Sequence, residues 1–402
     1  MLTRALMLLL TASMAMACSS DSGGALPDVV DDAVAEDTGP SDDASRIEIV
    51  IPDGRRAFDM AMSAPFDGEG TAWFDASWAE LEGRADVVTV VLDAGLPWEE
   101  IVSGDPWPAE FEAQVQRILD QVDAANLPLM LIVDPLNEAR DGFRRDLLGR
   151  TTVTPSFGDQ SFSDAYTSFL EALVLRTTPT YFAPVIGLDR YVTANSEQLE
   201  AAQSWFIDSQ RVIKRARAVL YFPIWNYWAV TDAVAEQNTT ILALLDNLDQ
   251  VQDFFAISLY PAVEGARLSD LSVESFAPLD ASDREATNPV TTRPLAIVNA
   301  SFPAEGFTLG GVTYPSSENS QFNFLALLFQ VADEREVELV GWRMPVDPDA
   351  WLADPCGVDV GCDEEGLAAR YVRFRSNGLL NELLQPRAAL DLWDQYHQRD
   401  RL

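Results

Sequence analysis

Acidic side chains stand at or just beyond the ends of three apolar runs of this chain. Asp93 and Asp134 each end such a run, and Asp189 follows a third, two residues after Gly187. Two carboxylates that face each other can act as a general acid and as a base or nucleophile. The competing interpretation is structural, because an aspartate can cap the loop after a strand and Asp189 can pair with Arg190. Both interpretations stay open at the level of sequence.

Apolar runs alternate with amphipathic runs from residue 46 to residue 402, which is typical of a parallel sheet covered by helices. We expect strands at Phe58–Ala64, Asp86–Asp93, Leu127–Asp134, Tyr181–Gly187, Val219–Trp225, Phe254–Tyr260, Leu295–Asn299 and Val337–Met344. Helices are expected at Asp75–Gly83, Pro108–Ala125, Ser163–Leu175, Ser196–Ala218, Thr239–Leu248 and Ser320–Glu334. Arg46–Pro52 alternates and is expected to be an accessory or edge strand.

Eight such strands predict an α/β fold, a single (β/α)8 TIM barrel spanning residues 46–402. The carboxyl ends of its strands would meet at one mouth, so acids from different strands could converge there. A doubly wound open sheet is the main competitor, but no glycine-rich phosphate loop follows an early strand.

Composition excludes several classes of function. A formal charge of −37 opposes binding to nucleic acid phosphates. The chain has one histidine, His397, which argues against a histidine-based triad or a multi-histidine metal centre. We therefore expect no cofactor, no metal site and no nucleic acid partner, and we expect a monomer.

Two stretches resemble motifs of the clan A glycoside hydrolase superfamily, whose TIM barrels carry two catalytic glutamates. Pro179–Tyr191 resembles the fourth-strand motif P-x-Y-L-x-I-G-N-E-V-D-x-Y of a bacterial secreted branch, and Ile297–Pro303 resembles the seventh-strand pattern of aliphatic residues followed by x-E-x-G-Y-P. Tyr314–Gln321 is similar to the loop that leads into the next helix. The resemblance covers most of residues 57–395 and implies a barrel that acts on glycosidic bonds.

The chain departs from this family where the two glutamates would stand. Gly187 takes the place of the acid, and Asn299 takes the place of the nucleophile. A retaining glycosidase needs two carboxyl groups about 5–5.5 Å apart, and neither glycine nor an amide can replace them. Asn299 could still hold a sugar hydroxyl. The resemblance therefore implies a barrel with lost or impaired hydrolysis, with Asp189 as the candidate substitute acid.

The resemblance also implies a carbohydrate-binding cleft. Aromatic rings at strand ends can stack on the C–H faces of sugars, although core packing is an equal alternative for Trp225. The expected binding residues are Asp93, Asp134, Asn137, Arg140, Trp225, Tyr260, Asn299 and Trp342.

The first residues have the pattern of an export signal. Met1–Arg4 is positively charged and Ala5–Ala17 is apolar but short, which predicts a lipoprotein signal peptide over residues 1–17. The box Ala-Met-Ala-Cys at residues 15–18 predicts a lipid anchor on Cys18, and an ordinary secretory signal is the alternative. Residues 18–45 are rich in acids and small residues, which predicts a disordered tether. In an exported protein, Cys356 and Cys362 most simply form a disulfide.

These patterns lead to one leading hypothesis and two alternatives. We expect an exported bacterial lipoprotein, anchored at the periplasmic or cell-surface side, that recognises a poly- or oligosaccharide in a barrel cleft with hydrolysis lost or impaired. The first alternative is an active polysaccharide hydrolase that uses displaced aspartates. The second is a barrel that binds a protein partner in the envelope.

Overall fold

The computed structural model describes residues 45–65, 72–262, 264, 266–280, 290–309, 312–335, 337–348 and 374–402. The chain divides into the units Met1–Pro40 and Ser41–Leu402, and the fold described below is that of the second unit. The predicted signal peptide, Cys18, the tether up to residue 44 and the pair Cys356 and Cys362 lie outside the described residues.

The second unit is built on one sheet of nine parallel strands. They are β1 (Asp59–Ala64), β2 (Val87–Leu92), β3 (Leu129–Val133), β4 (Tyr181–Ala183), β5 (Leu220–Tyr221), β6 (Ile224–Asn226), β7 (Phe255–Leu259), β8 (Leu295–Ala300) and β11 (Val337–Trp342). The sheet order is β5-β4-β3-β2-β1-β11-β8-β7-β6. Each strand is therefore hydrogen-bonded in parallel to its neighbour around the sheet.

The two ends of the sheet belong to one chain segment, and this closes the barrel. β5 pairs with β4 and β6 pairs with β7, while Ile186, three residues after β4, bridges to Ile224 in β6. β5 and β6 together are the predicted fifth strand, which is interrupted at Pro223 because proline has no N–H for a ladder hydrogen bond. The predicted (β/α)8 barrel is confirmed.

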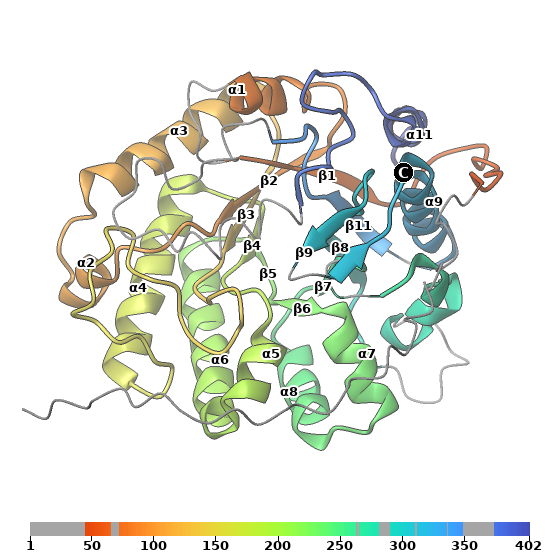
Figure 1. Ribbon diagram of the computed structural model, residues 1–402. Coiled ribbons are helices and arrows are strands. Elements are labelled where there is room, and N and C mark those ends of the chain that lie inside the picture. Colours follow the sequence, from red (N-terminus) through yellow and green to blue (C-terminus); the bar gives the residue numbers. More distant parts are fainter. Residues whose placement is uncertain are drawn as a thin grey trace, which may run out of the picture. The chain divides into compact units, whose positions relative to one another are not determined.

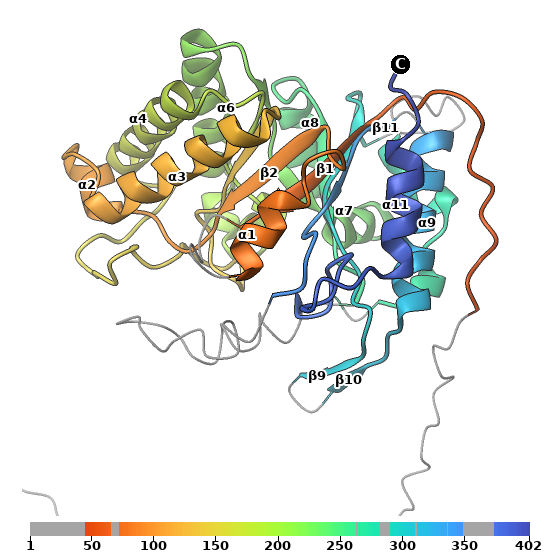
Figure 2. The ribbon, with the colours of Figure 1, turned by 90° about the horizontal axis from the view of Figure 1, so that it is seen from above.

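Helices form an outer layer around the strands (Figure 1). They are α1 (Ala72–Ala79), α2 (Trp98–Ser103), α3 (Ala109–Ala125), α4 (Gln160–Thr177), α5 (Leu188–Ala194), α6 (Leu199–Ala216), α7 (Tyr227–Ala235), α8 (Thr239–Asp249), α9 (Glu318–Glu334) and α11 (Ala388–His397). A hairpin of β9 (Phe307–Leu309) and β10 (Val312–Tyr314) projects from the barrel after β8 (Figure 2). In the described part of the chain, no helix is both long enough and apolar enough to cross a membrane.

The expected strand at Arg46–Pro52 is wrong, because the structure gives this segment no strand. It runs along α9 instead, where the Ile47 N–H donates to Asn323 Oδ1 at 2.9 Å and Arg46 Nε donates to Asn319 Oδ1 at 2.9 Å. A closed barrel leaves no free sheet edge on which an additional strand could pair.

Two apolar layers hold the strands, and successive residues of a strand point into different layers. On β7, Phe255 and Ile257 pack outward against the helices, whereas Ala256 points into the barrel. The barrel interior is filled by small and aliphatic side chains such as Met130 and Ile132. Each large side chain buried in these layers contributes about 1.5–3 kcal/mol. The alternation also decides which residue at a strand end reaches the mouth.

The amino-terminal end of the barrel is closed by charged groups. Asp59 begins β1, is only 2% exposed, accepts a hydrogen bond of 2.9 Å from the Tyr181 hydroxyl and lies 2.6 Å from Arg401 Nη1. Arg56 is paired in two contacts with Asp86 at 2.6 and 2.8 Å. In barrels of this kind, functional sites lie at the opposite end, where the carboxyl-terminal ends of the strands meet.

Candidate functional site

Polar residues collect at the carboxyl-terminal ends of the strands. This mouth brings together residues at or beyond the ends of seven different strands: Asp93, Asp134, Gly187, Asn226, Tyr260, Asn299 and Arg343. Most of them are far apart in sequence, and closure of the barrel brings them to one end of it.

Asp134 follows β3 and is held by two arginines. Its Oδ1 lies 2.5 Å from Arg140 Nη1 and its Oδ2 lies 2.7 Å from Arg144 Nη2. Burial raises the pKa of the Asp134 carboxyl, but the two guanidinium groups more than offset this and hold the pKa below its ordinary value. Asp134 is therefore a fixed anion, unsuited to donate a proton to a leaving group.

Arg140 fills the space beside Gly187. Gly187 has φ +70°, a left-handed conformation that favours glycine, and it lies just before α5. A Cβ placed on Gly187 would lie 3.2 Å from Arg140 Cδ and 3.3 Å from Arg140 Nε. A side chain at this position would therefore press against an arginine that is hydrogen-bonded to Asp134.

Asp189 lies in the first turn of α5 and is fully buried. Its carboxylate accepts the Asn226 N–H at 3.3 and 3.4 Å, at the start of α7. Burial raises the pKa of Asp189 to about 6. The structure therefore places the candidate substitute acid in the wall of the barrel, where its carboxylate contacts backbone and no solvent.

Asn226 joins three elements at the mouth. Its Oδ1 caps α7 by accepting the Ala229 N–H at 3.0 Å and also accepts from Arg190 Nη2 at 3.1 Å. Its Nδ2 donates to Glu264 Oε1 at 3.3 Å, and Arg190 forms an ion pair with Glu264. This cluster was missed by the sequence reasoning, although an asparagine before a helical run is a capping signal.

A β-bulge sets the direction of Asn299. The pairing of β7 with β8 is regular up to Ile257 and Ile297 and then skips one residue, so that Ser258 lies opposite Asn299. Asn299 is 1% exposed, and its Oδ1 has no hydrogen-bond partner within the described residues. A buried acceptor without a donor is costly, so Asn299 Oδ1 is an unsatisfied polar group at this end of the barrel.

Arg343 and two aromatic rings form a second wall of the mouth. Arg343 Nη1 donates to the Tyr260 hydroxyl at 3.0 Å, and its guanidinium carbon lies 4.4 Å from the centre of the Phe374 ring. The Nη2 atom lies 3.9 Å from Asp93 Oδ2. Arg343, which the sequence reasoning did not single out, thus lies close to both Tyr260 and Asp93 at this end of the barrel.

The expected placement of Trp225 and Trp342 at the cleft is wrong. Trp225 and Trp342 are fully buried between strands and helices. The indole N–H of Trp225 donates to Gln252 Oε1 at 3.2 Å, and that of Trp342 donates to the Asn377 carbonyl at 3.0 Å. On each strand the next residue points the other way, so Asn226 and Arg343 reach the mouth in their place.

Asn137 shapes its own loop rather than facing a ligand. Its Oδ1 accepts the N–H groups of Asp141 and Gly142 at 3.2 and 3.4 Å, and its Nδ2 donates to Asp141 Oδ1 at 2.7 Å. These bonds hold the loop that carries Arg140. Asn137 thus supports the mouth indirectly.

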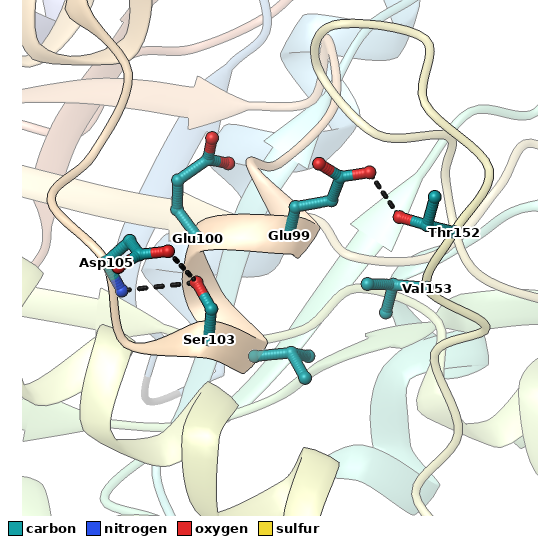
Figure 3. Close-up of a pocket in the computed structure, with 7 residues that line it drawn as sticks. Glu99, Glu100, Ser103, Asp105, Thr152 and Val153 are labelled. Carbon is teal, nitrogen blue, oxygen red and sulfur yellow. Dashed lines mark hydrogen bonds between the residues drawn. The ribbon is translucent and has the colours of Figure 1, made fainter.

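Two hollows lie outside the ring of strands. The larger, of about 360 Å³, is bounded by α2 and by Thr152 and Val153 (Figure 3). Its carboxylates are already engaged, because the Thr152 hydroxyl donates to Glu99 and Arg150 pairs with Glu99 and Glu100. The second, of about 280 Å³, lies between α4 and α6. Across the described ranges, no three acidic, histidine or cysteine side chains are grouped to hold a metal ion.

No protein-family model and no curated protein matches the chain. Its fold matches solved structures with low sequence identity. A GH5_18 protein from Streptomyces cattleya in complex with GlcNAc is 17% identical with a TM-score of 0.57, over 86% of this chain and 80% of that one. The exo-β-1,4-mannosidase Op5Man5 from Opitutaceae bacterium strain TAV5 is 10% identical with a TM-score of 0.56, over 87% of this chain and 62% of that one. A GH10 endoxylanase from a sugarcane soil metagenome is 11% identical with a TM-score of 0.53, over 85% of this chain and 97% of that one. The chain therefore has the TIM-barrel fold of glycoside hydrolases.

Proposed function

We propose that the protein binds a carbohydrate at the carboxyl-terminal mouth of its barrel and does not hydrolyse it. The observation that carries the proposal is the exchange at Gly187. The resemblance expects an acid there, and the space beside it holds Arg140, which is 2.5 Å from Asp134. A permanently charged guanidinium cannot protonate a leaving oxygen, because its pKa lies far above neutral pH.

The second expected carboxylate is replaced by the amide of Asn299, which cannot attack an anomeric carbon. Its buried Oδ1 has no donor among the described residues and can accept a hydrogen bond from a sugar hydroxyl. Arg343, Tyr260 and Phe374 add a donor, a hydroxyl and two ring faces to the same mouth. These groups support binding without chemistry.

Two of the three displaced aspartates, Asp134 and Asp189, do not support the active alternative. Asp134 is locked by two arginines, and Asp189 is fully buried with its carboxylate on a backbone N–H. The protein-scaffold alternative has no specific contact in its favour and becomes an outcome of the test.

The test combines binding with turnover. Affinity electrophoresis and calorimetry with GlcNAc, mannan and xylan, and with Manβ1-4GlcNAc, which a substituted form of the Streptomyces cattleya protein binds, should show binding of at least one glycan. Aryl glycosides should show no turnover. Asn299→Ala should weaken binding about tenfold, as expected for a lost buried hydrogen bond. The exposed Asn247 of α8 provides the matched control, Asn247→Ala, which should bind like the wild type.

Two results would sink the proposal. One is failure to bind any of these glycans, which would leave the protein-partner scaffold. The other is turnover that Asp189→Ala abolishes, which would favour the displaced-acid hydrolase.

Export and lipid attachment at Cys18 belong to the same proposal, and the signal-like residues 1–17 support them. Labelling of cells with a radioactive fatty acid should mark the protein, and Cys18→Ser should remove the label. An unlabelled, released wild-type protein would indicate an ordinary secretory signal instead.

A further inference from the structure

We infer that the hollow between α4 and α6 is a second binding site, and that it takes a small polyhydroxylated ligand without negative charge, such as a single sugar. The hollow has a volume of about 280 Å³ and lies outside the ring of strands. The two helices that bound it lie side by side (Figures 1 and 2). This site is separate from the mouth and does not depend on the function proposed for the mouth.

Short side chains leave the space between the two helices open. Packed helices normally fill the groove between them with interdigitating side chains. Here Ser163, Thr167 and Ser204 line the hollow, and none of them is long enough to fill it. The buried rings of Phe157 and Trp205 form its floor, with their centres 4.4 Å apart. An aromatic floor with hydroxyl groups around it suits a ligand that has both C–H and O–H groups.

Thr167 brings an unused hydroxyl to this hollow. The residue is 9% exposed, and its Oγ1 has no hydrogen-bond partner in the described part of the chain. Thr177 and Thr193, also on helices, instead donate to the backbone carbonyl four residues earlier, both at 2.8 Å. The Oγ1 of Thr167 is not one of the unpartnered atoms that are closed off from solvent, so a molecule in the hollow can reach it. A hydroxyl can both donate to and accept from a ligand hydroxyl.

Trp205 contributes a second unsatisfied group. It is 3% exposed, and within the described residues its Nε1 donates to no acceptor. Its ring is stacked against Phe157 and Tyr166, with angles of 27° and 15° between the planes. A buried donor without an acceptor is costly, so an acceptor oxygen at the floor of the hollow would be stabilised there.

The rim of the hollow opposes anions. Asp164, Glu200 and Asp208 line it, and none of the described residues that line it is a lysine, an arginine or a histidine. Glu200 has no hydrogen-bond or ion-pair partner among the described residues. Asp164 accepts only from the neutral amide of Gln160, and the ion pair of Asp208 with Arg211 is largely exposed and therefore weak. Carboxylates accept hydrogen bonds from hydroxyl and ammonium groups, so the rim favours a neutral or cationic ligand.

The experiment follows the indole N–H resonances of the full chain labelled with nitrogen-15. The probes are glucose, galactose and mannose, each with its amino sugar and its uronic acid. Trp205→Phe keeps a ring at this position and identifies the resonance of Trp205. Trp393 is the internal control, because its Nε1 already donates to the Arg84 carbonyl at 2.7 Å and it borders neither hollow.

We expect at least one neutral sugar to shift the Trp205 resonance and to leave that of Trp393 unchanged. The amino form of that sugar should bind at least as tightly as the neutral form. Its uronic acid should bind about tenfold more weakly, because like charges repel.

Two variants connect this binding to the hollow. Thr167→Val keeps the shape of the side chain without its hydroxyl and should weaken binding about tenfold, as expected for one lost hydrogen bond. Ser204→Leu fills the hollow from an exposed position of α6 and should abolish the shift. The matched control is Ser168→Leu, an exposed position of α4 that does not line the hollow, and this variant should bind like the wild type. If Thr167→Val does not fold, Ser204→Leu still decides the matter.

Three results would overturn the inference. The first is a Trp205 resonance that none of these sugars shifts, which would leave water as the occupant of the hollow. The second is a uronic acid that binds as tightly as its neutral sugar. The third is binding that Ser168→Leu weakens as much as Ser204→Leu. Binding at the mouth is measured separately, because Asn299→Ala should weaken it and leave the shift of Trp205 unchanged.

Discussion

Replacing Gly187 with alanine tests whether Arg140 really occupies the side-chain space of that position. The substitution adds one methyl group in a residue with φ +70°. A side chain in this left-handed conformation costs about 1–2 kcal/mol. The new Cβ would also lie 3.2 Å from Arg140 Cδ, and Arg140 cannot retreat freely because Asp134 holds it. Overpacking of this kind costs about 1–3 kcal/mol more.

Gly104 provides a control with the same backbone conformation and no neighbour. It has φ +74°, it caps α2, and nothing lies within 4 Å of its Cβ position. Gly104→Ala should therefore lose only the conformational part, about 1–2 kcal/mol, and Gly187→Ala about 2–5 kcal/mol. The difference between the two losses isolates the contact with Arg140.

The assay is urea unfolding of both variants, followed by tryptophan fluorescence, with slopes checked for two-state behaviour. Combining Gly187→Ala with Arg140→Gly should recover about 1 kcal/mol relative to the sum of the single losses, because the crowded pair is then absent. Equal losses for Gly187→Ala and Gly104→Ala, with no coupling to Arg140, would refute the reasoning. They would also remove the main argument against hydrolysis.

Three further changes have defined outcomes. Gly341→Ala would place a Cβ 2.5 Å from the Val298 carbonyl oxygen, so urea unfolding should show a loss of about 1–3 kcal/mol in the free energy of unfolding. Glycan binding should also weaken, because the bulge next to Asn299 must shift. Asp134→Asn should lower the free energy of unfolding by about 3–5 kcal/mol at pH 7, because a buried ion pair loses its anion. The folded-state pKa of Asp134 is depressed, so the carboxylate stabilises the fold above about pH 3.8. The difference in stability between this variant and the wild type should therefore shrink as the pH falls below that value. In the wild type the folded-state pKa of Asp189 is raised to about 6, so the stability of the fold decreases as the pH rises from about 3.8 through 6. Asp189→Asn removes this ionisation and should therefore raise the free energy of unfolding at pH 7.5 by at most about 3 kcal/mol.

Two results would contradict these expectations. Glycan binding by Gly341→Ala that equals the wild type would show that the bulge does not set the amide of Asn299. A pH profile of Asp189→Asn that runs parallel to the wild type between pH 4 and 8 would show that this buried carboxyl does not titrate in that range.

The barrel could be predicted from the sequence because its strands are buried on both faces. Runs such as Asp86–Asp93 and Leu127–Asp134 are continuous apolar segments, and the strands β2 and β3 lie inside them. The long helices could be predicted for a different reason, since α3 and α6 have apolar residues at helical spacing on one face. The short helices α2, α5 and α7 are too brief to show such a period, and they were missed.

The property that made the strands easy to predict made the site hard to predict. A strand that is apolar on both faces has no contrast between its inward and outward residues, so the sequence does not say which of two neighbours at its end faces the mouth. Aromatic chemistry favoured Trp225 and Trp342, whereas the barrel turns Asn226 and Arg343 toward the mouth. Counting in steps of two from an inward residue such as Ile224 would have found Asn226.

Gly187 and Arg140 are linked, because the arginine lies where a side chain at position 187 would begin. From the sequence, the position reads only as the loss of an acid. In the structure, Arg140 adopts φ +59°, uncommon for an arginine, and extends into the space beside Gly187 while bonding Asp134. A glutamate introduced at position 187 would meet this guanidinium and form an ion pair with it rather than act as a free acid. Under the proposed function, turnover would need Gly187→Glu, Asn299→Glu and the replacement of Arg140 together, and aryl glycoside assays of the single, double and triple variants would test this.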